Sequence, residues 1–274
     1  MKKVHLPQSK EADVMHVIDL SEETQNDYFT CLEEWSDEMK DGVCRKECWY
    51  DAMRKKGLRV KLARNDAGVV AGMIHYVPIE QSWIEGENLY FIYCIWVHGH
   101  KKGRGDLRKR GVGTALLRAA EEDTRSLQAK GLVVWGLLLP FFMRAGWFKK
   151  HGYRKVDRNG ISILLWKPFS DDASPPRWIK AKKKPELVPG KVVVTALVNG
   201  WCSGINGMIE RAHQISCEFG DKVIYREIDT GSREAVREWG LSDGLFVDDK
   251  NIYKGPPLSY EKIRKIIGKK VQRL

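Results

Sequence analysis

Hydrophobic and polar positions follow two different periods along the chain, which predicts β-strands and α-helices in alternation. Strand-like patterns occur at 14–20, 57–79, 88–99, 132–139 and 160–169. Helix-like patterns occur at 21–35, 113–131 and near 141–151. The range 57–79 holds two strands joined by a turn at 65–68, where Asn, Asp and Gly cluster. Segments 88–99 and 132–139 are apolar on both faces, so we expect an α/β (α+β) domain with these two strands at its centre.

A proline-rich and lysine-rich segment divides the chain. Residues 170–190 contain four of the ten prolines and have no hydrophobic period, which predicts an exposed linker. We therefore expect one domain at 1–169 and a smaller α/β domain at 191–274. The elements expected in the smaller domain are strands at 191–199 and 222–229, helices at 205–219, 232–239 and 259–270, and a hairpin at 244–255.

Composition and charge narrow the possible partners. The 274 residues are 43% hydrophobic and 30% charged, as in globular proteins. The net charge of +11 favours phosphate-bearing partners, either a phosphorylated cofactor or, less favoured, nucleic acid. There is no apolar run of about 18 residues, and the N-terminus lacks an apolar stretch. We expect a cytoplasmic protein with no membrane contact, whose six scattered cysteines are reduced.

The most informative segment is 97–117, where a strand is followed by a basic, glycine-rich loop and then a helix. Glycines let backbone amides approach a ligand closely, and a helix N-terminus offers unpaired N–H groups. Neither the Gly-x-Gly-x-x-Gly nor the Gly-Lys-Ser/Thr phosphate motif fits the segment. The residues expected to bind an anion are Arg108, Arg110, Gly111, Val112, Gly113 and Thr114.

Two motifs in this order resemble the GNAT acyltransferase family. The Arg-x-x-Gly-x-Gly sequence at 108–113 is similar to the family's pyrophosphate loop, and the aromatic-x3-Gly-aromatic sequence at 148–153 is similar to its last helix and turn. The resemblance covers roughly 88–169. Segments 75–83 and 94–99 further resemble the YoaP-like group, in which a GNAT domain precedes a thioredoxin-like domain.

The resemblance implies acetyl-CoA as co-substrate, bound between the two central strands where they splay apart. Pantetheine would lie along the backbone of Ile95, Trp96 and Val97, where an N–H polarises the thioester. An amine of a small molecule or peptide would then attack directly. Phe148 would pack against the cofactor, but the family often has a tyrosine there as the acid that protonates the thiolate.

The remaining catalytic candidates come from position in the pattern. Glu80, just past the third strand, is the favoured general base, and His75, Glu85 and Glu87 are its alternatives. Tyr93, the tyrosine at 153 or a water would replace the missing acid.

Histidine and cysteine spacings suggest two weak metal motifs. Cys94-x3-His98-x-His100 lies partly within a buried strand, where a core thiol is the simpler interpretation. The pair at 44 and 48, with Cys31 nearby, has helical spacing but lacks a second ligand pair. We therefore expect no metal site.

The element order of 191–274 resembles the thioredoxin-like fold, and Cys202 falls at the expected redox position, where a strand ends and a helix begins. Ile205 replaces the second cysteine of Cys-x-x-Cys, and Cys217 would be about 20 Å away along the helix. The proline that usually precedes the third strand is also missing. A dithiol oxidoreductase is therefore not expected, whereas a single-thiol site and a purely structural domain both remain open.

Three functions follow from these patterns. The favoured one is an acetyl-CoA-dependent N-acetyltransferase. The second is a CoA-binding or thiol-binding sensor without turnover, which Phe148 keeps open. The third is a basic nucleic-acid-binding protein, whose binding would depend steeply on salt.

Overall fold

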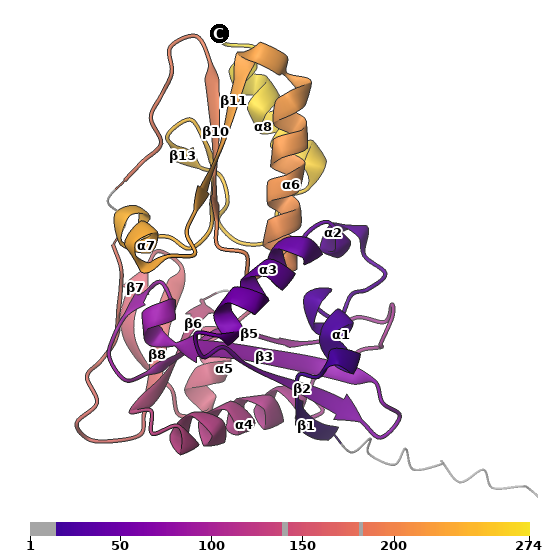
Figure 1. Cartoon of the computed structure of the whole chain (residues 1–274), viewed down its shortest axis with the longest axis vertical. Coiled ribbons are helices and arrows are strands. Elements are labelled where there is room, and N and C mark those ends of the chain that lie inside the picture. The colour runs from indigo at the N-terminus through magenta and orange to yellow at the C-terminus, as the bar shows by residue number, and fades with distance from the viewer. Residues whose placement is uncertain (1–14, 139–141, 181–182) are drawn as a thin grey trace, which may run out of the picture.

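The chain folds into an N-terminal α/β unit with a smaller C-terminal unit standing on one face of its sheet (Figure 1). The computed structural model describes residues 15–138, 142–180 and 183–274. The strands of the N-terminal unit are β1 (Met15–Asp19), β2 (Arg59–Asn65), β3 (Val70–Pro78), β4 (Ile84–Glu85), β5 (Tyr90–Val97), β6 (Gly131–Leu137), β7 (Arg154–Asn159) and β8 (Ser162–Pro168). Its helices are η1 (Glu22–Thr24), α1 (Gln25–Phe29), α2 (Asp37–Lys40), α3 (Val43–Arg54), η2 (Ile79–Gln81), α4 (Val112–Ser126) and α5 (Ala145–Lys150).

Seven strands form one mixed sheet in the order β1-β2-β3-β5-β6-β8-β7. All neighbours are antiparallel except β5 and β6, which run parallel at the centre of the sheet. The parallel pair requires a crossover, and α4 supplies it. The predicted central position of both strands is confirmed.

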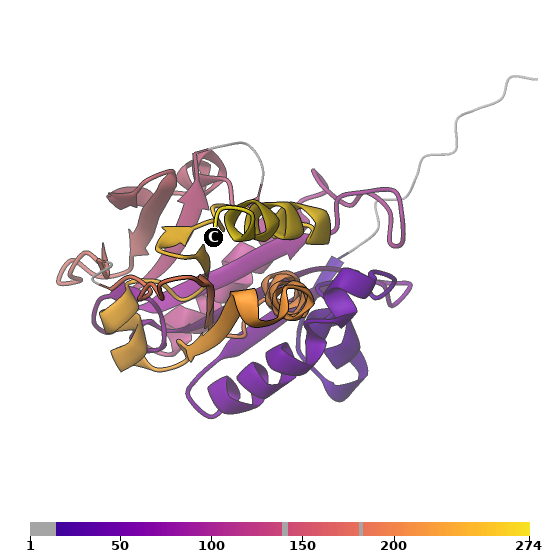
Figure 2. The ribbon, with the colours of Figure 1, turned by 90° about the horizontal axis from the view of Figure 1, so that it is seen from above.

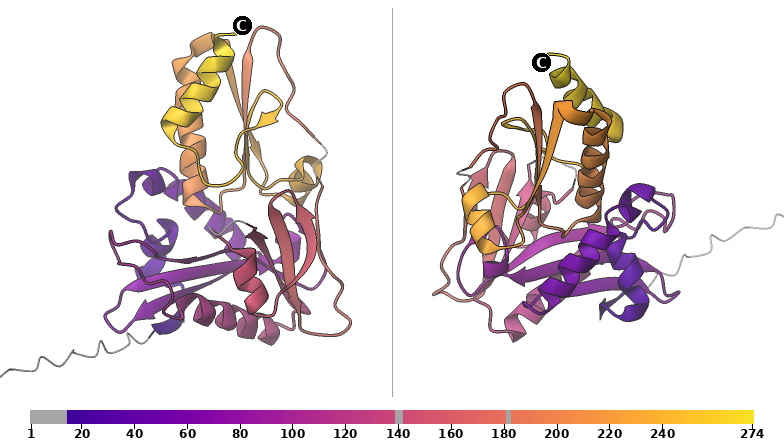
Figure 3. Two further views of the ribbon diagram at one scale, coloured as in Figure 1. Left: turned by 180° about the vertical axis from the view of Figure 1, so that it is seen from behind. Right: turned by 45° about the horizontal axis from the view of Figure 1, so that its top comes forward.

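Helices cover both faces of this sheet. The amphipathic α4 lies beneath it, as Figure 3 shows from behind, and buries Leu116, Leu117 and Ala120 there. Above the sheet, α3 packs Trp49 and Met53 into a second, larger apolar core. In the described part of the chain no helix is long and apolar enough to cross a membrane.

The C-terminal unit has a four-stranded sheet of its own. Its elements are β10 (Val192–Val198), α6 (Ser203–Glu218), η3 (Gly220–Lys222), β11 (Val223–Asp229), α7 (Arg233–Trp239), β12 (Gly244–Val247), β13 (Lys250–Asn251) and α8 (Tyr260–Val271). The strand order is β11-β10-β12-β13, with β10 and β11 parallel and the other pairs antiparallel. Helices α6 and α8 cover one face, whereas Trp239 of α7 packs with Leu197 and Phe246 on the other.

Two predicted helices end earlier than their apolar patterns suggested. The expected helix at 21–35 stops at Phe29, because Cys31 and Leu32 adopt left-handed backbone angles, with φ of 53° and 65°. The expected helix at 113–131 stops at Ser126, and Gln128, with φ of 60°, makes the left-handed turn. Apolar residues keep their helical spacing beyond such a left-handed turn, so the sequence pattern does not show where the helix ends.

Strand β4 and two further strands lie where the sequence predicted none. Strand β7 is largely exposed and polar, so it lacked the apolar alternation of a buried strand. The segment predicted to be an exposed linker contributes β9 (Arg177–Trp178), which pairs with β4 and buries Ile179. The linker is therefore partly fixed to the N-terminal unit.

The first turn of α6 sits directly against α2 and α3 (Figure 1). Figure 2, from above, shows α6 end on over the N-terminal unit. Asn206 is fully buried and donates from Nδ2 to the carbonyl oxygens of Gly42 and Gly200, at 3.1 and 2.8 Å. A Cβ at Gly42 would lie 2.0 Å from the carbonyl oxygen of Ser203, and one at Gly207 would lie 2.4 Å from that of Glu38. The glycines thus allow two backbones to touch.

Charged side chains and an indole also join the two units. Arg45 of α3 binds Glu227 of β11 with two hydrogen bonds, at 3.0 and 2.9 Å. Trp201 packs its ring against Tyr93 of β5, at 5.6 Å between centroids, and donates from Nε1 to Asp243 at 2.7 Å. The upper core is consequently continuous between the units.

We predict that Gly207→Ala loosens this contact. Its Cβ would lie too close to the Glu38 carbonyl oxygen, which should lower the free energy of unfolding by about 1–3 kcal/mol. The higher helix propensity of alanine should offset about 1 kcal/mol of this loss, and the net effect should lower the urea midpoint. Gly204→Ala, in the same helix, would meet the side chains of Met39 and Pro257 at 3.4 Å, an ordinary contact distance, and is the matched control. Urea unfolding of both variants checks the prediction, and equal midpoints would contradict it.

We also predict a pH dependence from Asp243. Burial raises the pKa of this carboxyl to about 6, despite hydrogen bonds from Ser242, Trp201 and Asn199. The folded state then binds the proton more tightly than the unfolded state, so stability should fall as the pH rises from about 4 to 6. Relative to Asp243→Asn, which has no such proton, the free energy of unfolding of the wild type should fall by about 2 kcal/mol over that window. Urea unfolding at both pH values measures this difference, and a constant difference would refute the assignment.

Candidate functional site

Strands β5 and β6 are paired only over their first halves. Their register runs from Tyr90–Leu132 to Ile92–Val134 and then stops. At this point β5 carries one extra residue, because Tyr76 of β3 faces Ile92 while His75 faces Cys94, leaving Tyr93 between. Such a bulge bends a strand. Beyond it β5 stays paired with β3 but no longer pairs with β6. The predicted divergence of the two central strands therefore exists, and it begins beyond Ile92.

The backbone of β5 past the bulge faces this opening. Ile95, Trp96 and Val97 are partly buried and form no backbone pairing with β6. Aromatic rings border the opening, since Phe142 lies 5.8 Å from Trp96 and 5.9 Å from Trp135. The three β5 residues expected to lie along pantetheine thus occupy the diverging part of the strand.

The basic loop ends at the N-terminus of α4, as the sequence predicted. Gly111 precedes the helix with φ of 80°, a left-handed conformation suited to glycine, and a Cβ there would meet nothing within 4 Å. The first intrahelical bond runs from the amide of Ala115 to the Gly111 carbonyl. The amides of Val112, Gly113 and Thr114 in the first turn therefore have no intrahelical acceptor and are suited to bind an anion.

The two predicted arginines of this loop differ in their contacts. Arg108 is held by Asp106 through hydrogen bonds of 2.9 and 2.7 Å, and the ion pair lowers the pKa of Asp106. Arg110 is exposed and forms no ion pair within the described ranges. Of the two arginines, Arg110 carries the charge that is available to a ligand.

The insertion at 98–107 is anchored rather than free. Arg104 is largely buried, forms ion pairs with Asp27 and Glu34, and donates to the Val70 carbonyl at 2.9 Å. Lys101 and Lys102 at its tip remain exposed. The loop is therefore fixed to α1, and its tip lysines are free to meet a ligand.

Sequence reasoning missed two neighbours of the helix terminus. His151 accepts from the Thr114 hydroxyl at 3.1 Å when its Nδ1–H donates to the Trp147 carbonyl at 2.9 Å. The Trp147 ring contacts the His151 ring at 4.2 Å between centroids, tilted by 42°, and lies 3.4 Å from where a Cβ of Gly113 would be. Positions 147 and 151 are four apart on α5 and its last turn, and that spacing was the available signal.

Phe148 lies in the core below the sheet. It is fully buried between Trp147 and Tyr153, with ring centroids 5.0 and 5.8 Å away. Its side chain supports the α5 face that carries Trp147.

The predicted base and acid lie on the upper side, near the C-terminal unit. Glu80 is exposed on η2, and Arg233 of α7 donates to the carbonyl oxygens of Ile79 and Ser82 on either side of it. Tyr93 is buried, and its hydroxyl donates to the Gln81 carbonyl at 2.8 Å, while burial raises its pKa. Both groups thus lie on or against the turn 79–82.

Two of the three alternatives to Glu80, namely Glu85 and His75, are engaged elsewhere or enclosed, whereas Glu87 is exposed. Glu85 pairs with Arg233 at 3.2 Å and Arg237 at 3.5 Å. His75 is buried among aromatic rings, and burial together with Lys46 lowers its pKa well below the usual range. Neither is placed like the exposed Glu80.

Cys202, the third predicted reactive residue, is the N-cap of α6 at the boundary between the units. Cys31 is its neighbour, with its sulfur 3.8 Å from the hydroxyl of the adjacent Ser203, and Lys46 of α3 lies 3.3 Å from the Cys31 sulfur. Cys202 together with the lysine lowers the pKa of Cys31 well below its usual range, and the same contact and burial raise the pKa of Cys202. Sequence spacing could not reveal this neighbour, because 171 residues separate the two cysteines (202 − 31).

The other cysteine and histidine spacings do not converge. His98 donates from Nδ1 to the Gly105 carbonyl at 2.7 Å, and His100 contacts Glu33, whereas Cys94 belongs to the upper core. Cys44 and Cys48 are exposed on α3. Within the described residues, no group of three or more His, Cys, Asp or Glu side chains is arranged to hold a metal ion.

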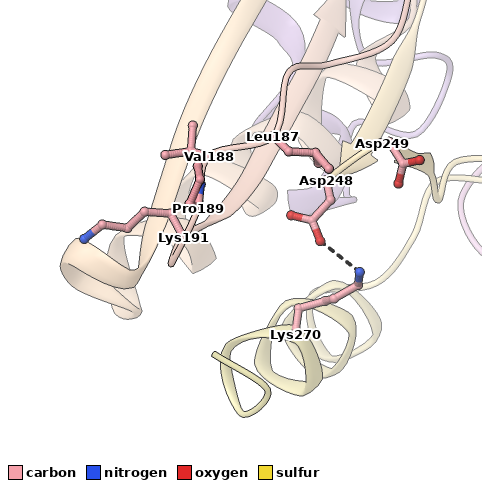
Figure 4. A pocket seen from close by; sticks show the side chains of 7 residues that line it. All are labelled: Leu187, Val188, Pro189, Lys191, Asp248, Asp249 and Lys270. Atoms are coloured by element: carbon pink, nitrogen blue, oxygen red, sulfur yellow. Dashed lines mark ion pairs between the residues drawn. The ribbon is translucent and has the colours of Figure 1, made fainter.

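A shallow pocket of the C-terminal unit lies at the end of the linker (Figure 4). Its side is formed by an ion pair of 2.8 Å between Lys270 and Asp248. It is lined by Leu187, Val188, Pro189, Lys191, Asp248, Asp249 and Lys270. None of these residues belongs to the diverging strands, the basic loop or the α6 terminus.

Comparison with known proteins agrees with this geometry. Residues 18–153 match the model described as "Acetyltransferase (GNAT) family". The chain is 22% identical over 232 residues to the uncharacterized N-acetyltransferase YoaP of Bacillus subtilis (strain 168), covering 82% of this chain and 86% of that protein.

Solved structures of the same family are more distant. A GNAT acetyltransferase from Brucella melitensis in complex with acetyl-CoA is 18% identical, with a TM-score of 0.39, over 60% of this chain and 92% of the other. YhbS from Escherichia coli in complex with CoA is 13% identical, with a TM-score of 0.43, over 60% and 87%. The family assignment rests on the sequence model and on the segment that it spans. The family model thus supports a GNAT acetyltransferase domain at residues 18–153.

Proposed function

We propose that this protein transfers the acetyl group of acetyl-CoA to an amine by direct attack. The observation that carries the proposal is the divergence of β5 and β6 next to the free N-terminus of α4. An extended thioester fits between diverging strands, and its phosphates fit at a helix terminus. Relatives crystallised with acetyl-CoA or CoA support the choice of co-substrate.

Binding would use backbone groups more than side chains. The amides of 111–114 would hold the pyrophosphate, and Arg110 would add an unpaired positive charge. Lys101 and Lys102 are exposed on the anchored insertion and suit the 3′-phosphate. Trp147 and His151 border the same terminus and offer flat surfaces.

The reaction itself would depend on the backbone of β5. A backbone N–H of Ile95, Trp96 or Val97 would donate a hydrogen bond to the thioester carbonyl and polarise it. Such an N–H is available on the β6 side, because these residues do not pair with β6. Glu80, exposed on η2, would take the proton of the attacking amine. Tyr93 would have to release the Gln81 carbonyl before acting as an acid.

Because Phe148 cannot donate a proton, the group that would protonate the leaving thiolate is not assigned. This favours one alternative function, a CoA-binding sensor. A CoA-binding sensor needs the same anion site but no proton donor. A thiolate leaves without an acid, because the thiol pKa is close to 8.5, so the phenylalanine is compatible with turnover. Turnover of acetyl-CoA in the presence of amines separates the two functions.

We further propose that the chain comprises a GNAT domain at 1–169, a linker at 170–190 and a thioredoxin-like domain at 191–274. The order β11-β10-β12-β13 with helices on both faces supports this assignment of the C-terminal domain. A soluble cytoplasmic location and a small-molecule or peptide acceptor accord with the same proposal, whereas nucleic acid is not favoured.

Calorimetric titration with acetyl-CoA tests the binding step. The wild type should bind, and Gly113→Asp should weaken binding at least about tenfold, because its carboxylate would repel the pyrophosphate. The Cβ would sit 3.4 Å from Trp147, so the fold should tolerate it. Gly255→Asp makes the same charge change where nothing lies within 4 Å and should bind as the wild type does. Equal affinity of all three proteins, or no binding, would refute the site.

Steady-state acetylation of a polyamine and peptide panel tests the base. Glu80→Gln should lower kcat about 100-fold at neutral pH, since it removes the proton acceptor while preserving shape. Glu122→Gln, at an exposed position of α4, is the matched control and should stay within about twofold of the wild type. Equal kcat values for both variants would exclude Glu80 as the base.

A further inference from the structure

Two cysteines from different units meet where α6 is seated on the N-terminal unit. Cys202 is the N-cap of α6, and Cys31 lies in the turn after α1. Their side chains are neighbours, since the Cys31 sulfur is 3.8 Å from the hydroxyl of Ser203, the residue after Cys202, and Cys202 lowers the pKa of Cys31. We call Cys31 and Cys202 the junction thiols. Both are half-buried and neither is bonded to another cysteine.

A fully buried lysine accompanies the pair. Lys46 contacts the Cys31 sulfur at 3.3 Å, the Tyr28 carbonyl, and the face of the Tyr28 ring at 4.1 Å. Among the ion pairs of the described residues, none includes Lys46. A buried ammonium requires a negative partner, and the Cys31 thiolate is the contacting group that can supply this charge.

The local backbone holds the two sulfurs together. Cys31 and Leu32 are held in left-handed conformations that cost non-glycine residues about 1 kcal/mol or more each. The Ser203 hydroxyl donates to the Phe29 carbonyl and ties this turn to α6. The positive end of the long α6 helix also faces the pair.

The other ionisable groups around the pair stay neutral. Burial raises the pKa of Tyr28, of Cys94 on β5, and of Tyr253 beyond β13. The cluster therefore has one stabilised negative charge, on Cys31, and one neighbouring thiol that retains its proton, on Cys202. A nucleophilic thiolate beside a protonated second thiol is the arrangement of a reactive dithiol.

We propose that the junction thiols are a redox-active dithiol that reduces small disulfides and closes into a Cys31–Cys202 disulfide between the two units. In a Cys-x-x-Cys motif the second cysteine would stand at 205, where this chain has Ile205. Cys31 of the N-terminal unit would take the place of that second cysteine. The bond would fix α6 to the turn after α1, over the upper face of the sheet.

The exchange balances without a further reactant. The Cys31 thiolate attacks one sulfur of R–S–S–R, forming Cys31–S–S–R and releasing RS⁻, which takes a proton from solvent. Cys202 then gives up its proton, attacks the Cys31 sulfur and displaces the second RS⁻, which receives that proton. Two protein thiols are oxidised to one disulfide, and one small disulfide is reduced to two thiols.

Reaction of the reduced, full-length protein with glutathione disulfide tests the proposal. Non-reducing peptide mapping should find the Cys31–Cys202 cross-link, and intact mass should show the loss of two hydrogens. At pH 7, Cys31 should be alkylated by iodoacetamide at least about tenfold faster than the exposed Cys44 in the same molecule. A persistent glutathione adduct without the cross-link, or equal alkylation rates, would overturn it.

Variants assign the roles of the individual groups. Cys202→Ser should stop the reaction at glutathione bound to Cys31, whereas Cys217→Ser should behave as the wild type. Lys46→Met should slow the alkylation of Cys31 at least about tenfold, and the exposed Lys55→Met should not. If Lys46→Met fails to fold, the pH dependence of thiolate absorbance in the wild type replaces it. A first thiol ionisation near the ordinary value of about 8.5 would then reject the proposal.

Discussion

The upper face of the seven-stranded sheet is apolar along its whole centre, and this surface must be covered. Trp83, Phe91 and Tyr93 all point to that side, where their rings contact one another. Helix α3 covers only part of the face, with Trp49 against Tyr93. Trp201, which precedes α6, covers the remainder, so the C-terminal unit completes the core of the N-terminal one.

This shared core gives the two faces of the sheet different roles. Below the sheet, α4 presents an exposed N-terminus and a basic loop, with Arg110 unpaired in the described part of the chain. Above it, the turn at 79–82 is held by Arg233 of the other unit. A co-substrate approaching from the loop and an acceptor approaching from the junction would reach β5 from different sides. Seating of the C-terminal unit would then shape the acceptor side.

The junction thiols depend on the same seating. Glycines at 42 and 207 let the α6 terminus approach α2 and α3 until backbone atoms touch, and this approach brings Cys202 to Cys31. Lys46 is enclosed by the same contact. Cys94 of β5 lies in the core beside the junction thiols. Redox chemistry at these thiols and acyl transfer along β5 would therefore both involve strand β5.

The sequence by itself determined most elements and the anion loop. Apolar periods located β5, β6 and α4, and the glycines at 111 and 113 marked the helix terminus, because these features depend on neighbours close in the chain. It could not locate β7, whose exposed residues lack alternation, or the end of α1, where Cys31 turns left-handed. Only the tertiary structure decided that Tyr93 is the extra residue that separates β5 from β6, that His151 holds Thr114, and that Cys31 faces Cys202. Such contacts arise from packing between segments distant in sequence, and no local pattern encodes them.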